Sequence, residues 1–60
     1  MKRREFIRRL EHEGCELARS GGKHDLYRNP ATGAVTTVPR HSELGNTLCK
    51  EIRKQLGLKA

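Results

Sequence analysis

Apolar side chains recur at helical spacing near the start of the chain. Between residues 2 and 13, Phe6 and Leu10 stand four positions apart with Ile7 beside them, and charged residues flank all three. This spacing predicts a helix with one apolar stripe. Gly14 is expected to end the helix, because glycine readily adopts the left-handed conformation found at helix C-termini.

A second helix is predicted over residues 46–57. Its stripe is made of apolar residues at four-residue spacing with a cysteine alongside, namely Leu48, Ile52, Leu56 and Cys49. Asn46 is the expected N-cap, since a short polar side chain can accept a bond from the first free backbone N–H groups. Gly57 is expected to close this helix.

Between the helices the period changes to the two-residue alternation of strands. Strands are predicted over residues 15–18, 24–29 and 34–38, separated by Gly- or Pro-containing turns at 20–23 and 29–33. Pro39 should end the third strand because it has no N–H to donate. The result is an α+β fold in the order α-β-β-β-α, a three-stranded antiparallel sheet with both helices on one face. Residues 1–60 are expected to form a single domain.

The charge balance indicates a polyanionic partner. Thirteen Lys and Arg against seven Asp and Glu give the 60 residues a net charge of +6, which favours nucleic acid as the first candidate. No apolar run approaches the roughly 20 residues of a membrane span, and the opening MKRREFIRRL lacks the apolar stretch of a secretory signal. We therefore expect a cytoplasmic protein that does not bind membranes.

The cysteines and histidines do not predict a metal site. Cys15 and Cys49 form no CxxC pair, and their spacing from His12, His24 and His41 does not match a zinc finger or ribbon. Unexported cysteines are expected to stay reduced. No metal or other cofactor is predicted.

Three local motifs carry a family resemblance. They are Gly22-Lys23-His24 followed by Tyr27, then Val38-Pro39-Arg40-His41, and the closing helix Thr47–Leu58 with its Thr-Leu start and Gln-Leu-Gly end. The element order is that of double-stranded-RNA-binding domains, but the second helix does not open with their lysine cluster. The motifs more closely resemble the HicA toxin family, the ribonuclease half of HicA–HicB toxin–antitoxin pairs. One departure is Lys23, where that family usually has Ser.

The resemblance implies a metal-independent endoribonuclease that cuts mRNA, with one strand-borne His essential for activity. The matching position is His24. It also implies a HicB-like antitoxin that covers this residue. The chemistry of the side chain agrees independently, because an imidazole can take the proton of a ribose 2′-OH or give one to the departing 5′ oxygen at cellular pH.

Strand alternation leaves two placements open for His24. If Tyr27 packs beneath the helices, His24 and Arg28 face outward together as a small cationic site. If Leu26 is the core residue instead, His24 lies at the core-facing edge. Periodicity does not choose between them, but a His that acts on RNA must reach its substrate, which favours the first.

The remaining candidates lie beside His24 or at the end of the third strand. His41 is either the second acid–base group or a turn residue that orders the loop over residues 42–45. Lys23, Arg28 and Arg40 are predicted to contact phosphates. The alternative hypothesis is a non-catalytic RNA-binding module of the same fold, and a further one is a family member that Lys23 has inactivated.

Overall fold

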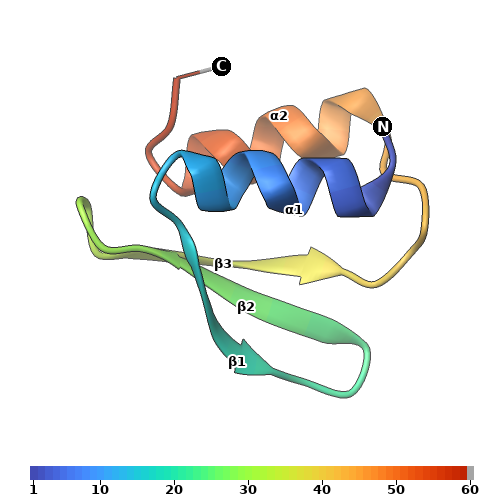
Figure 1. The fold of residues 1–60 in the computed structure, drawn as a ribbon, viewed down its shortest axis with the longest axis horizontal. Coiled ribbons are helices and arrows are strands. Elements are labelled where there is room, and N and C mark those ends of the chain that lie inside the picture. The colour runs from blue at the N-terminus through green and yellow to red at the C-terminus, as the bar shows by residue number, and fades with distance from the viewer. Residues whose placement is uncertain (60) are drawn as a thin grey trace.

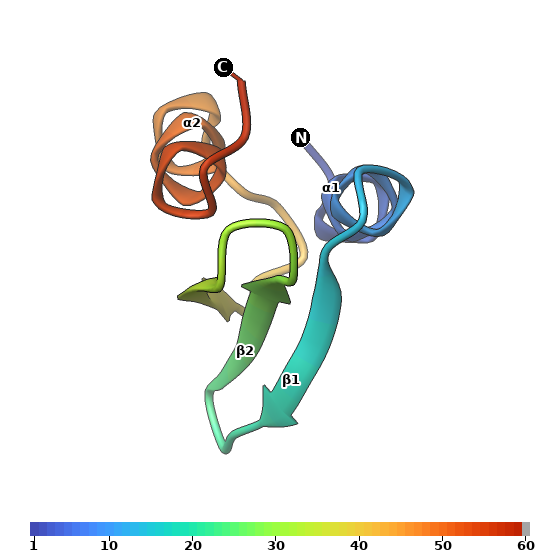
Figure 2. The same ribbon diagram turned by 90° about the vertical axis from the view of Figure 1, so that its left-hand side faces the viewer.

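The computed structural model describes residues 1–59. Its elements are α1 (Arg3–His12), β1 (Glu16–Ser20), β2 (His24–Asn29), β3 (Ala34–Pro39) and α2 (Asn46–Gln55). The strands form one antiparallel sheet in the order β1-β2-β3. Figures 1 and 2 show both helices on the same face of this sheet, with α1 above β1 and β2 and α2 on the side of β3. The predicted order and α+β class are confirmed.

The central strand β2 pairs with both neighbours along its length. Against β3 the register runs from His24 opposite Pro39 to Asn29 opposite Ala34. Pro39 is thus the last residue of β3 rather than the first beyond it. Its missing N–H costs nothing there, because β3 is an edge strand.

Strand β1 differs from its prediction over residues 15–18. It starts one residue later and extends to Ser20, which pairs with Asp25, and a β-bulge between Leu17 and Arg19 shifts the register. The turn is tighter than expected, so the ladder continues to Ser20. All five residues of this edge strand are exposed. The buried residue at this position of the chain is Cys15, just before β1.

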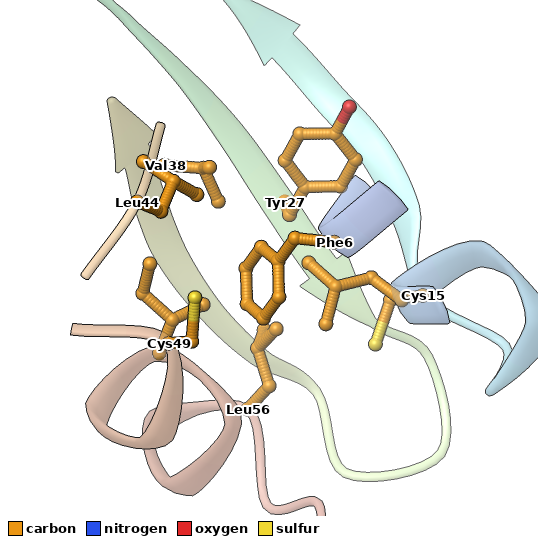
Figure 3. Packing of buried hydrophobic residues seen from close by; sticks show 9 residues of the cluster. Phe6, Cys15, Tyr27, Val38, Leu44, Cys49 and Leu56 are labelled. Carbon is orange, nitrogen blue, oxygen red and sulfur yellow. The ribbon is translucent and has the colours of Figure 1, made fainter. Parts of the chain in front are cut away.

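The core lies between the helices and one face of the sheet (Figure 3). It consists of nine buried apolar residues, namely Phe6, Leu10, Cys15, Tyr27, Val38, Leu44, Cys49, Ile52 and Leu56. Figure 3 shows the Phe6 ring among side chains from both helices and the sheet. Tyr27 is only 4% exposed, so the first of the two placements considered for His24 is the one observed.

Two predictions about α2 are wrong. Leu48 is 38% exposed, since the buried stripe runs through Cys49, Ile52 and Leu56 and Leu48 lies about 100° around the helix from Cys49. Leu44, which precedes the helix, fills the core at this end. The N-cap is Gly45 rather than Asn46, and no side chain caps the helix.

Glycines end both helices as predicted. Gly14 has φ +95° and Gly57 has φ +76°, the left-handed region that other residues rarely adopt. The end of α2 is further fixed by buried Asn29, whose Nδ2 donates to the Leu56 carbonyl at 2.7 Å. Neither helix in the described part of the chain is long and apolar enough to cross a membrane.

Two leucines of the α2 region allow a matched test of this core. Leu56→Ala should lower the free energy of unfolding by about 3 kcal/mol, because Leu56 is fully buried and its removal leaves a cavity. Leu48→Ala should cost less than about 1 kcal/mol. Urea unfolding followed by circular dichroism measures both. Equal losses would contradict the packing of α2 described above.

Candidate active site

The turn between β1 and β2 delivers His24 to the start of its strand. The Gly21 N–H donates to the His24 carbonyl at 2.8 Å and closes the turn. A Cβ built on Gly21 would lie 2.6 Å from that same carbonyl oxygen, whereas one on Gly22 would meet nothing within 4 Å. Only glycine therefore permits the close approach of backbone at residue 21 that sets where His24 emerges.

His24 lies on the face of the sheet that the helices leave uncovered. Along β2 the exposed and half-buried residues alternate with buried Asp25, Tyr27 and Asn29, so His24 points away from the core. An open depression of about 260 Å³ surrounds it, lined by Arg19, Gly21, Gly22, Lys23, His24, Leu26 and Thr37. The imidazole is therefore accessible to a large ligand.

The cations beside His24 differ in part from those expected. Lys23 lines the depression, as does Arg19 of β1. Arg28 shares the face of His24 but stands four residues along β2, about 13 Å away at strand spacing, with its Nη1 3.4 Å from a Glu16 carboxylate oxygen. Arg28 is thus not part of the immediate surroundings of His24.

Arg19 was missed because the predicted first strand ended at residue 18. The observed register pairs Ser20 with Asp25 and Arg19 with Leu26, so Arg19 is on the same face of the sheet as His24. The Gly-Gly pair that marks the turn was the available signal.

Asp25 binds two arginines on the helix-facing side of β2. Its Oδ1 accepts hydrogen bonds from Arg40 Nε at 3.0 Å and Nη2 at 2.7 Å, and its Oδ2 accepts one from Arg3 Nη2 at 2.8 Å. Arg3 Nε also donates to the Pro39 carbonyl at 2.7 Å. The hydrogen bonds of Arg40, and then the hydrogen bond of Arg3, hold the pKa of the Asp25 carboxyl below its ordinary value of 3.8 despite partial desolvation.

Arg40 therefore has a partner within the protein that sequence reasoning did not anticipate. Two of its three guanidinium nitrogens are bound to Asp25. Its side chain is nevertheless 45% exposed, and its third nitrogen, Nη1, is not bound to Asp25.

His41 is exposed on the segment that follows β3. It lies two residues beyond Pro39, the residue that pairs with His24. Backbone bonds with the start of the chain hold this segment, namely Arg3 N–H to the Ser42 carbonyl at 2.9 Å and Leu44 N–H to the Met1 carbonyl at 2.8 Å. Residues 1–3 therefore hold part of the loop over residues 42–45 in place.

Two larger depressions lie along α1, away from His24. One of about 890 Å³ is lined by Glu5, Arg8, Arg9, His12, Glu13 and Arg53, and one of about 630 Å³ by Lys2, Arg3, Arg4, Ile7, Arg8, Glu11 and Ser42. Both mix charges of the two signs, as a solvated helix face does. Across residues 1–59 no three His, Cys, Asp or Glu side chains gather as metal ligands would. Both cysteines are free and buried.

Comparison with known proteins agrees with the family that the sequence motifs resemble. The family model described as HicA toxin of bacterial toxin–antitoxin matches residues 3–58. The chain belongs to the HicA toxin family. It is 41% identical over 61 residues to a protein of Pseudomonas fluorescens (strain Pf0-1) named "Probable mRNA interferase HicA", and the match covers 98% of each chain. No solved structure matches it.

The two adjacent glycines give a direct test of the turn that carries His24. Gly21→Ala should displace the turn, because the new methyl group meets the His24 carbonyl oxygen. The amide resonances of residues 20–25 in a ¹H–¹⁵N spectrum should shift strongly. Gly22→Ala meets open space and should shift only its immediate neighbours. Similar spectra for the two variants would contradict the close approach at Gly21.

The ion pairs of Asp25 predict an acid-sensitive contribution to stability. A carboxyl whose pKa is lowered by folding stabilises the protein fully above the unfolded pKa, and this stabilisation is lost as pH falls through the folded value. The free energy of unfolding should thus fall below about pH 4, the ordinary range of an aspartic acid. The decrease should be shallower in Asp25→Asn. Parallel pH profiles for the two proteins would contradict the ion pairs described here.

Proposed function

We propose that this protein is the toxin of a toxin–antitoxin pair, a metal-independent endoribonuclease that cleaves mRNA in the cytoplasm with His24 as a proton-transfer group. The observation that carries the proposal is the exposed imidazole of His24, next to cations on the uncovered face of the sheet, in a chain of the HicA toxin family. The name of the Pseudomonas relative, a probable mRNA interferase, supports the RNA substrate.

The chemistry needs only proton transfer and positive charge. A base removes the proton of a ribose 2′-OH, the 2′ oxygen attacks the adjacent phosphorus, and the bond from phosphorus to the 5′ oxygen breaks. An acid donates a proton to that departing oxygen, so the products are a 2′,3′-cyclic phosphate and a 5′-hydroxyl. His24 performs one of these transfers and His41 is proposed for the other. Imidazole serves either role near neutral pH.

Cations around His24 would bind the RNA backbone and stabilise the charge that develops on phosphorus. Lys23 and Arg19 line the same depression as His24, so they suit the scissile phosphate. Arg28 lies further along β2 and suits a neighbouring phosphate. Arg40 would contribute through Nη1, the nitrogen that Asp25 leaves free.

A HicB-like antitoxin is the proposed protein partner, covering His24. The face of the sheet that carries His24 also exposes an apolar side chain, Val35 of β3, which lies opposite Arg28 and is 47% exposed. The net charge of +6 suits a partner with an acidic surface. A protein that binds this sheet would exclude RNA from the depression around His24.

Replacing His24 tests the proposal. His24→Ala should reduce cleavage of single-stranded RNA by purified protein at least 100-fold, since general acid–base groups contribute about 10²–10⁴-fold. His12→Ala is the matched control, because His12 is an exposed histidine on α1 away from this site, and it should keep full activity. Cleavage should be unchanged in EDTA, and the product should end in a 2′,3′-cyclic phosphate.

Cleavage by His24→Ala at the rate of the original protein would refute the role of this residue. RNA binding without cleavage by the unaltered protein would instead favour a non-catalytic RNA-binding module. Loss of activity in EDTA would rule out the metal-independent mechanism.

A further inference from the structure

One carboxylate joins the two segments that carry the histidines. Asp25 directly follows His24 on β2, and its side chain accepts two hydrogen bonds from Arg40, which directly precedes His41. The same carboxylate binds Arg3 at the start of α1. Three parts of the chain that are distant in sequence thus converge on a side chain that is 12% exposed.

The sheet itself does not hold the segment of His41. The pairing of β2 with β3 ends where His24 lies opposite Pro39, so Arg40 and His41 lie beyond the last ladder pair. From the side of the sheet, Asp25 holds this segment through Arg40. From the side of the helices, Arg3 holds it through the Pro39 and Ser42 carbonyls.

We propose that Asp25 is a positioning residue, which fixes the segment of His41 relative to His24 through Arg40 and Arg3. This inference rests on the proposed function and deepens it, because it names a residue that contacts no substrate yet sets the geometry of the reacting groups. Stability alone gives a weak reason for such a cluster, since ion pairs shielded from water often stabilise a fold no better than apolar residues of similar size. Acid–base catalysis is sensitive to misplacement of about 1 Å.

Two substitutions break the cluster while changing the net charge in opposite directions. Asp25→Asn keeps the shape of the side chain but replaces one of its two acceptor oxygens with an NH₂ group, so the bonds to Arg40 and to Arg3 cannot both be kept. It removes a negative charge and so raises the net charge by one. Arg3→Gln removes the link from α1 and takes one positive charge away. An effect common to both therefore reports position, whereas effects of opposite sign report charge.

Glu13→Gln is the matched control for stability. Glu13 forms the other multiply bonded carboxylate–guanidinium pair, in which Arg53 Nη2 donates to Oε1 at 2.8 Å and Nη1 donates to Oε2. This pair joins the end of α1 to α2. It is remote from the turn between β1 and β2 that carries His24, because Figure 1 shows the end of α1 and this turn on opposite sides of the molecule.

The experiment measures kcat and KM for RNA cleavage at a temperature where circular dichroism shows each variant to be folded. Asp25→Asn and Arg3→Gln should each lower kcat by roughly ten- to a hundredfold. KM should fall in the first and rise in the second, following the charge. Amide hydrogen exchange should accelerate in both variants at residue 3 and Leu44, whose N–H groups bond the Ser42 and Met1 carbonyls. Asp25→Glu, which keeps the carboxylate, should recover part of kcat, and Glu13→Gln should change neither constant more than twofold.

An unchanged kcat in either folded variant would overturn the inference, as would kcat values that move in opposite directions. If Asp25→Asn does not fold, the kcat of Arg3→Gln decides. The proposed function fails separately, through His24→Ala that still cleaves. Active original protein, inactive His24→Ala and fully active Asp25→Asn together would refute only the positioning role.

Discussion

The helices cover only one face of the sheet, and the rest of the molecule follows from this constraint. Because side chains of β2 alternate between its faces, Tyr27 and Asn29 are committed to the core and His24 to solvent. Within residues 1–59, which the structure describes, no further helix or strand covers the other face. Residues 1–59 therefore present an imidazole, several cations and the exposed Val35 on one open surface, which is the surface we propose for RNA and for a protein partner.

The same alternation points Asp25 to the opposite face of the sheet from His24. His24 faces the depression, while the Asp25 carboxylate binds Arg3 and Arg40. In the proposed mechanism, His24 transfers a proton, while the adjacent Asp25 only supports the structure around it. The bond from Arg3 to the Pro39 carbonyl and the bonds of residues 1–3 to residues 42–44 bring the start of the chain into the support of the site.

Sequence reasoning recovered the parts that local patterns determine. The order of elements, the glycine stops and the outward placement of His24 follow from periodicity and turn chemistry, together with the need for substrate access. Leu48 was misassigned because four-residue spacing fits two adjacent stripes of a helix, and only packing against the sheet selects the one through Cys49. Asn46 was misassigned because the N-cap position depends on the local backbone. Here Gly45 is the N-cap and Asn46 is already the first residue of the helix. The partner of Arg40 was not predictable, since it requires knowing that residues 25 and 40 meet across the β2–β3 register.

The central claim is that the imidazole of His24 contacts the ribose and phosphate of bound RNA. The most direct measurement is a titration of the protein, with ¹³C-labelled histidine, against an RNA whose 2′ oxygens are methylated and which is therefore not cleaved. The ring resonance of His24 should shift saturably with RNA, and that of His12 should stay in place. Saturable binding that shifts His12 but leaves the His24 ring unperturbed would contradict the account.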